Sequence, residues 1–426
     1  MAKPETTDAA KTQGFAWAIL GIVYLLSISA AMLWFSAPPM AGSIIPAYIV
    51  QLGPENINSN FGMLMNTIAY GAIVSSLIAI FLQNKIGVKW ILVLAGACLV
   101  VGGLMAALSG TDFGLLNGSR VIAGLGIGFV AVSATTAISM WFNDDKRALA
   151  MALWATWVPV SMLVEYNIIV PICAGIDFHM TWWVITVLAA ISLVLCVFAY
   201  RMPNGGQIST EQTSLRSGVK FIKKRQVIAL CLCFFFYNFV SHGFTTYNPT
   251  FFTLDPAAGG MGWDDALANL VASIASAAGI IAPLFGAISD RLPFKNKYVL
   301  IVIGALGYVL ACCFGFKNLG LPMFLVYMVC MVVANGIVVA CVRPMMPMLV
   351  GRGGFTAVTL GLALITILEF GGQIFTSYYG MAIDAMGFST ASFAVGLPVA
   401  VLMVIAAVLV KPDKELIEAS EHAPQH

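Results

Sequence analysis

Long apolar runs separated by short polar loops cover almost the whole chain. A helix that spans a bilayer needs about 20 predominantly apolar residues, and twelve runs approach or exceed that length. None of them alternates apolar and polar residues at every second position, as a membrane β-barrel requires. Because a helix satisfies its own backbone hydrogen bonds in lipid, the pattern predicts twelve membrane-spanning helices. Their expected ranges are 16–48, 60–82, 88–109, 114–142, 147–170, 179–200, 226–252, 265–288, 297–316, 321–342, 356–381 and 387–410.

The composition argues against a soluble protein. Hydrophobic residues make up 60% of the 426 residues and charged residues 9%, whereas about 25% of a typical soluble chain is charged. The mean hydropathy of +0.93 leaves too few polar groups to cover a soluble globule of this size. We therefore expect an all-α integral membrane protein, and neither a soluble enzyme nor a nucleic-acid binder.

The nine cysteines lie almost entirely inside the apolar runs. They have neither the spacing of a zinc site nor the loop positions of a disulfide framework. We expect them to be small packing residues, and we expect no metal. The first apolar run is too long for the core of a cleavable signal peptide, so no signal peptide is expected.

The positions of lysine and arginine predict the orientation of the chain. If the N-terminus is cytoplasmic, 19 of the 21 basic residues fall at cytoplasmic helix ends and loops, and the exceptions are Arg120 and Lys317. Cytoplasmic loops of membrane proteins carry an excess of Lys and Arg. Both termini are therefore expected in the cytoplasm, with the protein in the plasma (inner) membrane.

The longest polar stretch, at about residues 201–225, is basic and lies between the sixth and seventh runs. It is expected to link two pseudo-symmetric six-helix bundles, 16–200 and 226–410, with cytoplasmic tails at 1–15 and 411–426. Two such halves are typical of secondary transporters, whose site lies at the interface of the repeats. The chain has no G-x-x-x-x-G-K-[ST] loop for ATP, so gradient-driven transport is expected.

Two loops and one helix carry short motifs. Residues 84–89 (Asn-Lys-Ile-Gly-Val-Lys) lie between the second and third runs, and residues 286–295 (Gly-Ala-Ile-Ser-Asp-Arg-Leu-Pro-Phe-Lys) lie between the eighth and ninth. The second loop resembles the G-x-x-x-D-R-x-G-R-[KR] signature of the major facilitator superfamily, and the first is a degraded copy. Residues 120–128 (Arg-x-x-x-Gly-x-Gly-x-Gly) resemble that superfamily's R-x-x-x-G-x-G motif. The resemblance covers about residues 15–411.

The resemblance implies two bundles that rock about a central cavity lined by helices one, four, seven and ten. It also implies that the two loops form a cytoplasmic gate, and ordinary positive-inside loop charge is the alternative. Asn84 replaces the acid of the signature and offers no charge-assisted bond. The predicted gating residues are Asn84, Gly87, Lys89, Gly286, Asp290 and Arg291. The glycines of residues 118–128, like Gly279 and Gly286, are expected to permit close helix packing.

Arg120, Glu165 and Glu369 are ionisable residues inside the apolar runs. Such groups are costly at membrane depth and are functional candidates by default. At 1.5 Å per residue, Arg120 and Glu165 each lie roughly 9 Å below the outer boundary, so we expect them to pair. The pair is either a permanent strut between two helices or a site in which Glu165 exchanges a proton or releases Arg120 to a substrate carboxylate.

Glu369 lies deeper, at roughly 18 Å. No basic residue is expected level with it, since Arg343 is placed near the cytoplasmic end of its run. A carboxyl group unpaired at this depth is expected to be protonated or to meet a proton or cation in transit. A protonated, hydrogen-bonded structural glutamate is the alternative. Gln373 supplies an amide one turn further along.

Aromatic and polar side chains offer further cavity walls. Trp154 and Trp157 share one helix face, and Pro159 is expected to bend that helix. Aromatic faces stack on planar solutes or hold cations, and His242 is a candidate proton carrier. The alternatives to substrate contact are that the tryptophan and tyrosine residues lie at the membrane interface or face lipid. For His242, the alternative is a polar packing role. The predicted substrate-binding residues are Arg120, Trp34, Trp154, Trp157, Tyr247, Asn248 and Gln373, and the predicted proton-coupling residues are Glu165, Glu369 and His242.

Several branches of the superfamily carry marks that this chain lacks, such as the arginines of nitrate carriers on helices two and eight. The patterns of helices one and five resemble the small-solute carriers grouped with cyanate and nitroimidazole transporters. One arginine with two glutamates favours a small organic carboxylate or zwitterion moved by proton symport. The alternative is proton-antiport efflux of an apolar or cationic compound, and a transporter-like receptor is a third possibility. The expected partners are the substrate, protons and the lipid bilayer, with no cofactor, no nucleic acid and a monomeric state.

Overall fold

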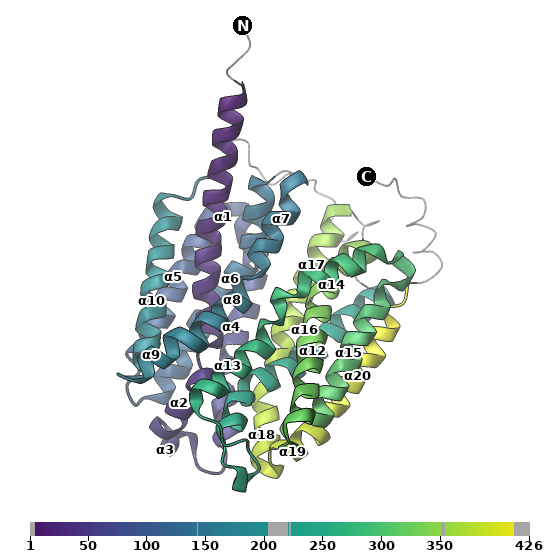
Figure 1. The fold of residues 1–426 in the computed structure, drawn as a ribbon. Helices are drawn as coiled ribbons and strands as arrows, with labels where there is room; N and C mark the ends of the chain where they lie inside the picture. The colour runs from purple at the N-terminus through teal and green to yellow at the C-terminus, as the bar shows by residue number, and fades with distance from the viewer. Residues whose placement is uncertain (1–4, 143, 203–219, 221–222, 351–353, 413–426) are drawn as a thin grey trace. The chain divides into compact units, whose positions relative to one another are not determined.

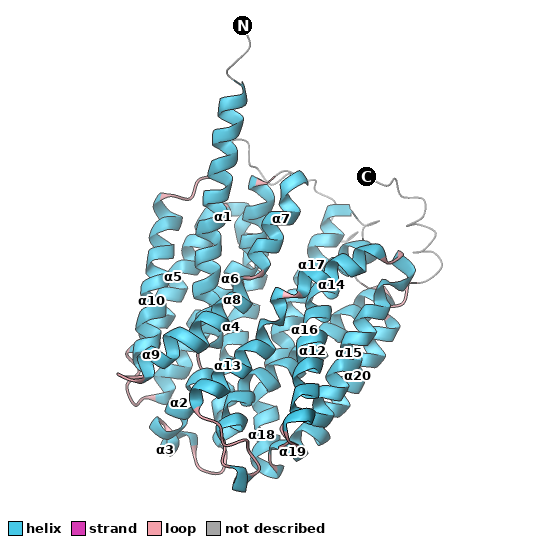
Figure 2. Cartoon of the chain, viewed as in Figure 1, coloured by secondary structure: helices cyan, strands magenta, loops and turns pink. Residues whose placement is uncertain are grey.

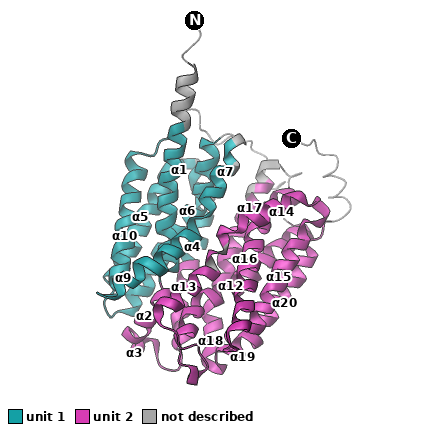
Figure 3. Ribbon diagram, in the orientation of Figure 1, with its two compact units in different colours: residues 1–36, 70–210 teal, residues 37–69, 211–426 magenta. Residues whose placement is uncertain are grey.

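The computed structural model describes residues 5–142, 144–202, 220, 223–350 and 354–412 (Figure 1). Every regular element within these ranges is a helix (Figure 2). Among the described residues, eleven helices are long and apolar enough to cross a membrane. The all-helical prediction is therefore confirmed. The chain forms two compact units, shown in different colours in Figure 3.

The first unit comprises residues 1–36 and 70–210. Its long helices are interrupted where a proline or a π-helical turn breaks the regular α-helical hydrogen bonding of the backbone. Its elements are α1 (Glu5–Phe35), the second part of α4 (Ile57–Ile86), α5 (Val88–Ala107), α6 (Phe113–Trp141), α7 (Asp144–Ala155), α8 (Trp157–Val164), the π-helical turn η2 (Glu165–Ile169), α9 (Val170–Ala174) and α10 (His179–Phe198).

The second unit comprises residues 37–69 and 211–426. It holds the first part of α4 together with the C-terminal helices. Its other elements are η1 (Pro38–Met40), α2 (Ala41–Ala47), α3 (Ile49–Leu52), α12 (Arg225–Thr253), η3 (Pro256–Ala258), α13 (Asp265–Ser276), η4 (Ala277–Ile280), α14 (Ala282–Arg291), η5 (Phe294–Asn296), α15 (Lys297–Phe314), α16 (Leu321–Val350), α17 (Gly354–Gln373), α18 (Thr376–Met386), α19 (Phe388–Ala391), η7 (Ser392–Gly396) and α20 (Leu397–Leu409).

Several predicted runs are divided into shorter helices. The first ends at Phe35 instead of near residue 48, because Pro38 and Pro39 lack the N–H groups that would continue the helix. The fifth breaks at Thr156, three residues before Pro159, as the expected bend requires. The eighth consists of α13, η4 and α14, and the eleventh is divided between α17 and α18.

The division into units does not follow the predicted bundles of residues 16–200 and 226–410, because residues 37–69 belong to the second unit. Polar contacts explain this grouping. The Asp384 carboxylate accepts hydrogen bonds from the backbone N–H groups of Asn58 and Ser59, and the Gln373 amide donates to the carbonyl of Met65 at 2.9 Å. The two six-helix repeats remain a prediction about sequence symmetry. Most of the predicted linker and of the C-terminal tail lies outside the described residues. Residues 5–15 of the predicted N-terminal tail belong to helix α1.

Glycines of α6 permit its close packing in the first unit. A Cβ added at Gly128 would lie 2.2 Å from the carbonyl oxygen of Ala72 on α4, and one at Gly126 would lie 2.9 Å from the carbonyl oxygen of Ala95 on α5. Any side chain at these positions would therefore force the helices apart. This agrees with the packing role expected for Gly126 and Gly128, whereas a Cβ added at Gly118 would meet only the Cε atom of Met105, at 4.0 Å.

Candidate functional site

Arg120 of α6 binds the end of helix α1. Its side chain is 1% exposed, and its guanidinium group donates to the carbonyl oxygens of Leu33 at 2.8 Å and Trp34 at 3.1 Å. It also donates to the Ser36 hydroxyl at 2.9 Å. Helix α1 ends at Phe35, so its last carbonyl groups have no partners within the helix. The cation satisfies these carbonyls and complements the negative end of the helix dipole.

Glu165 is fully buried at the first position of the π-helical turn η2. Neither carboxyl oxygen has a hydrogen-bond partner among the residues that the structure describes. Glu165 and Arg120 interact electrostatically. The expected pair is thus present as a long-range interaction, but the direct hydrogen-bonded pair is not formed, because the guanidinium group binds α1 instead. π-Helical turns inside α-helices occur frequently at functional sites.

Four aromatic rings from α1, α7 and α8 form a continuous row. The rings of Trp34 and Phe35 stack at 4.8 Å, and those of Trp154 and Trp157 stack at 5.7 Å. The Trp34 and Trp157 centroids are 6.4 Å apart and join the two pairs. The Trp154 indole donates to the Ser27 hydroxyl at 2.9 Å. The structure therefore brings the three predicted tryptophans together, beside the carbonyl that Arg120 binds.

In the second unit, Arg343 of α16 donates to the carboxylate of Glu369 on α17 and forms an ion pair with it. The expectation that Glu369 has no level basic partner is wrong. The apolar pattern predicts a helix end at residue 342, but α16 continues to Val350, about 12 Å further along the axis. Arg343 therefore lies well inside the helix.

The other predicted residues of the second unit are packed in its interior. The Tyr247 hydroxyl donates to the carbonyl oxygens of Asn58 at 2.8 Å and Thr376 at 3.1 Å. Asn248 accepts a hydrogen bond from Tyr327 at 2.8 Å. These contacts, like the one that Gln373 makes with α4, hold helices together. His242 is also buried, on α12.

The comparisons with known proteins agree with this architecture. The family model of the Major Facilitator Superfamily matches residues 18–363. The chain belongs to the major facilitator superfamily. Members of this superfamily are membrane transporters, so the protein is a multi-pass secondary transporter and not an enzyme.

Two solved transporter structures have a similar fold. A D-xylose–proton symporter superimposes with a TM-score of 0.70 at 15% sequence identity, over 93% of this chain and 97% of that chain. The xylose transporter XylE from E. coli, in a partially occluded inward-open conformation, has a TM-score of 0.69 at 15% identity, over the same shares of the two chains. These likenesses concern the fold alone.

The first copy of the superfamily's loop signature forms a sharp turn between α4 and α5. Gly87 has φ of +84°, a backbone conformation that favours glycine. Lys89 is half-buried on α5. The side chain of Asn84 lies outside the described part of the structure.

The second copy, residues 286–295, begins on α14 and ends in the short turn η5. The Asp290 carboxylate is 3.6 Å from the ammonium group of Lys297, and Arg291 is exposed. Gly286 and Asp290 line a cavity of about 180 Å³, together with residues of α15 and α16. A Cβ added at Gly286 would meet nothing within 4 Å. The expectation that Gly286 permits close helix packing is therefore wrong.

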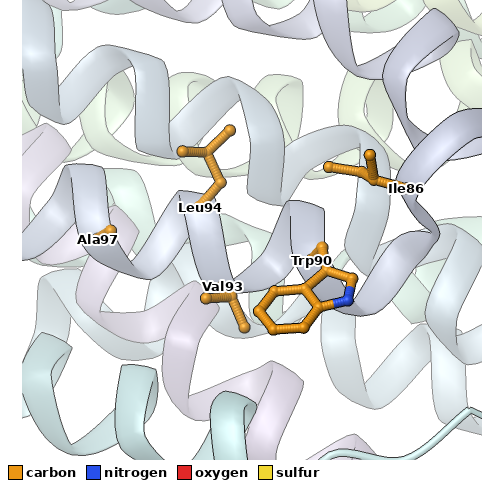
Figure 4. Close-up of a pocket in the computed structure, with 5 residues that line it drawn as sticks. All are labelled: Ile86, Trp90, Val93, Leu94 and Ala97. Carbon is orange, nitrogen blue, oxygen red and sulfur yellow. The ribbon is translucent and has the colours of Figure 1, made fainter.

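A larger groove, of about 660 Å³, lies on the first unit (Figure 4). It is lined by Ile86, Trp90, Val93, Leu94 and Ala97. No ionisable or hydrogen-bonding side chain other than the Trp90 indole is among these residues. The groove offers no charge recognition, and it is not the candidate site.

The sequence interpretation missed Ser36 and the partner of Glu369. The Ser36 hydroxyl accepts from Arg120 and, at 3.1 Å, from the indole of Trp182 on α10. The one sequence signal for Ser36 is its position just before the Ala-Pro-Pro segment that ends helix one. For Arg343, the signal was a basic residue followed by a continued apolar pattern as far as Val350.

Proposed function

We propose that this transporter moves a small organic carboxylate or zwitterion by alternating access, in symport with protons. The proposal places it in the plasma membrane as a monomer with both termini in the cytoplasm. The finer resemblance to the cyanate and nitroimidazole branch belongs to the same proposal. The D-xylose–proton symporter shares the fold and is a precedent for proton coupling within it.

The observation that carries the proposal is the environment of Glu165. Its two carboxyl oxygens are buried without hydrogen-bond partners among the described residues. Burying a carboxylate without hydrogen bonds costs several kcal/mol, and a neutral acid avoids most of this cost. The charge on Arg120 acts in the opposite direction and favours the carboxylate. A group between two such opposed influences is suited to gain and lose a proton as its surroundings change.

The aromatic row beside this group supplies the proposed contact surface. Trp34, Trp154 and Trp157 present large flat faces, which suit an organic solute with an apolar or cationic part. Arg120 acts in this proposal by fixing the end of α1 and by its charge on Glu165. Tyr247, Asn248 and Gln373 act by holding helices in the second unit. His242 remains a second candidate for the proton path.

Flux into proteoliposomes tests the proposal. The substrates are radiolabelled lactate, benzoate, glycine and alanine, and the lumen is made alkaline relative to the medium. We expect uptake of at least one of these to exceed its equilibrium level and to collapse when a protonophore is added. The Glu165→Gln variant is expected to exchange substrate across the membrane but to lose accumulation driven by the pH gradient.

The matched control is Glu55→Gln, because Glu55 is an exposed acid. Its accumulation is expected to equal that of the unmodified protein. If Glu165→Gln accumulates substrate as well as this control does, Glu165 is not the coupling acid. Export of an apolar or cationic compound under an inward proton gradient, with no carboxylate uptake, would replace the proposal by antiport efflux.

A further inference from the structure

The side chains of the Arg343–Glu369 ion pair are partly exposed, whereas those of Arg120 and Glu165 are buried. Both residues lie within candidate spanning helices, Leu321–Val350 and Leu360–Met386. The Arg343 side chain is 36% exposed and that of Glu369 is 18% exposed. Arg120 and Glu165 are at most 1% exposed. Charges at this depth face a water-filled space or the bundle interior and avoid lipid, so the exposed part of the pair is available to solutes.

Aromatic and amide groups surround the pair. The guanidinium carbon of Arg343 lies 5.9 Å from the ring centroid of Phe234 on α12. The Tyr237 ring stacks on Phe234 at 5.3 Å, and its hydroxyl donates to the Asn335 side chain at 2.5 Å. Tyr237 also interacts electrostatically with both members of the pair. A planar organic group bound at Arg343 would therefore have an aromatic neighbour.

A guanidinium group binds one carboxylate with two parallel hydrogen bonds. In the structure, Arg343 donates from Nη2 to one carboxylate oxygen of Glu369. An incoming carboxylate has the same chemistry and competes for the same donors. Once displaced, Glu369 would be a carboxylate without its cation at membrane depth, and uptake of a proton removes that charge.

We propose that Arg343 is the receptor for the substrate carboxylate and that Glu369 is the acid it displaces. The substrate carboxylate takes the place of Glu369 on Arg343, and a proton from water adds to the released Glu369 oxygen. The charge of the site is unchanged, since one anion and one proton enter together. This inference rests on the proposed symport of a carboxylate with protons. It assigns the proton taken up on substrate binding to Glu369, in addition to the coupling role proposed for Glu165.

The neighbours of Glu369 on the adjoining helices include a phenol and a guanidinium group. Helix α17 packs against α12 and α16. Among the described residues of these helices, Tyr237 and Arg343 interact electrostatically with Glu369, and the ring of Tyr308 on α15 lies 5.4 Å from the ring of Tyr237. His242 is also on α12 and is buried. Phenols and guanidinium groups keep one protonation state between pH 5 and 8. A pH dependence of binding in this range that disappears in Glu369→Gln would therefore report on Glu369, whereas one that persists in this variant would point to Glu165 or His242.

Equilibrium binding to purified protein tests the inference, with radiolabelled benzoate, lactate and acetate as probes. If one proton binds with each carboxylate, the Kd for the probe rises about ten-fold per pH unit, over the pH range in which the proton acceptor is ionised in the protein without probe. When the probe is mixed with the purified protein in an unbuffered solution that contains a pH-sensitive dye, about one proton should be taken up per molecule of probe bound. Glu369→Gln is expected to bind with a Kd independent of pH and without proton uptake. Arg343→Gln is expected to lose binding.

Two further variants separate this outcome from misfolding. Arg343→Gln combined with Glu369→Gln removes both charges and leaves no unpaired partner, so it should fold but not bind. Lys411→Gln removes an exposed charge of the same unit and should bind as the unmodified protein does. Binding by Arg343→Gln, an unchanged pH dependence in Glu369→Gln, or no binding of any probe by the unmodified protein would overturn the inference. Gradient-driven carboxylate uptake that persists in Arg343→Gln would overturn it while leaving the proposed function intact.

Discussion

Asp384 of α18 caps the beginning of α4 through Asn58. One carboxylate oxygen of Asp384 accepts from the backbone N–H of Asn58 at 3.0 Å and from its side-chain amide at 2.8 Å. The other oxygen accepts from the backbone N–H of Ser59 at 2.8 Å. The first N–H groups of a helix have no partners within the helix, and a carboxylate there also complements the helix dipole. This side chain therefore joins segments more than 320 residues apart in sequence.

Replacing Asp384 by alanine is expected to loosen this connection. Loss of a helix cap destabilises a protein by about 1 kcal/mol, and here the cap also joins two distant segments. We expect a lower midpoint of thermal unfolding in detergent and faster hydrogen exchange at the start of α4. Asp255→Ala is the control, because Asp255 caps a three-residue turn and accepts from Ala257 at 2.7 Å on the surface. Equal effects of the two substitutions would show that Asp384 is an ordinary local cap.

Replacing Arg120 by lysine separates a structural role from direct substrate binding. Lysine keeps the charge but lacks the planar fork that reaches Leu33, Trp34 and Ser36 together. Hydrogen bonds that involve a charged group contribute about 2 kcal/mol, so a clearly lower unfolding temperature is expected. Arg201→Lys is the control, since Arg201 is exposed and lies 5.9 Å from the Phe15 ring. An Arg120→Lys protein with unchanged stability and no substrate binding would instead identify Arg120 as the substrate clamp.

Alanine at two glycines of the superfamily motifs is expected to have opposite effects. In Gly128→Ala the new Cβ would lie 2.1 Å from the Ser75 hydroxyl and 2.2 Å from the Ala72 carbonyl. Overpacking of this kind costs about 1–3 kcal/mol. In Gly286→Ala nothing lies within 4 Å, and a helical alanine in place of glycine stabilises by about 0.4–1 kcal/mol. Thermal unfolding of both variants measures the difference, and a destabilised Gly286→Ala protein would contradict the open environment of Gly286.

The helices of this fold could be predicted from sequence because lipid imposes one strong rule. Each spanning segment must be apolar and long, and it must satisfy its own backbone. Breaks at Pro38 and near Pro159 follow from the missing N–H groups of proline. The π-helical turn at Glu165 has no comparable signature, since it depends on packing against neighbouring helices.

The partners of the membrane-depth charges were harder to predict than their positions. Sequence shows that Arg120 is deep, but its main acceptors are backbone carbonyls, which every residue has. Arg343 was placed too shallow because the end of an apolar run is not the end of the helix, and α16 continues to Val350. Depth along the chain predicted which charges are candidates, and the three-dimensional structure shows which of them meet.

Ser36 is expected to couple two donors that come from different helices. Its hydroxyl, fully buried, accepts from Arg120 at 2.9 Å and from Trp182 at 3.1 Å. In Ser36→Ala both donors lose this acceptor, and a buried donor left unsatisfied costs about 1–3 kcal/mol. Trp182→Phe removes the indole donor. In that background, Ser36→Ala leaves only the Arg120 donor without this acceptor.

A double-mutant cycle over Ser36→Ala and Trp182→Phe isolates this coupling from the volume lost at Trp182. Coupled residues in contact show interaction energies of about 0.5–3 kcal/mol, and the midpoints and enthalpies of thermal unfolding for the four proteins supply the measurement. We expect the double variant to be more stable than the sum of the single effects predicts. Ser29→Ala, paired with the same Trp182→Phe, is the control, because Ser29 donates to carbonyls of its own helix at 2.9 and 3.1 Å. If the two cycles give the same interaction energy, Ser36 is not coupled energetically to Trp182, and the guanidinium contacts to Leu33 and Trp34 hold the end of α1 without that coupling.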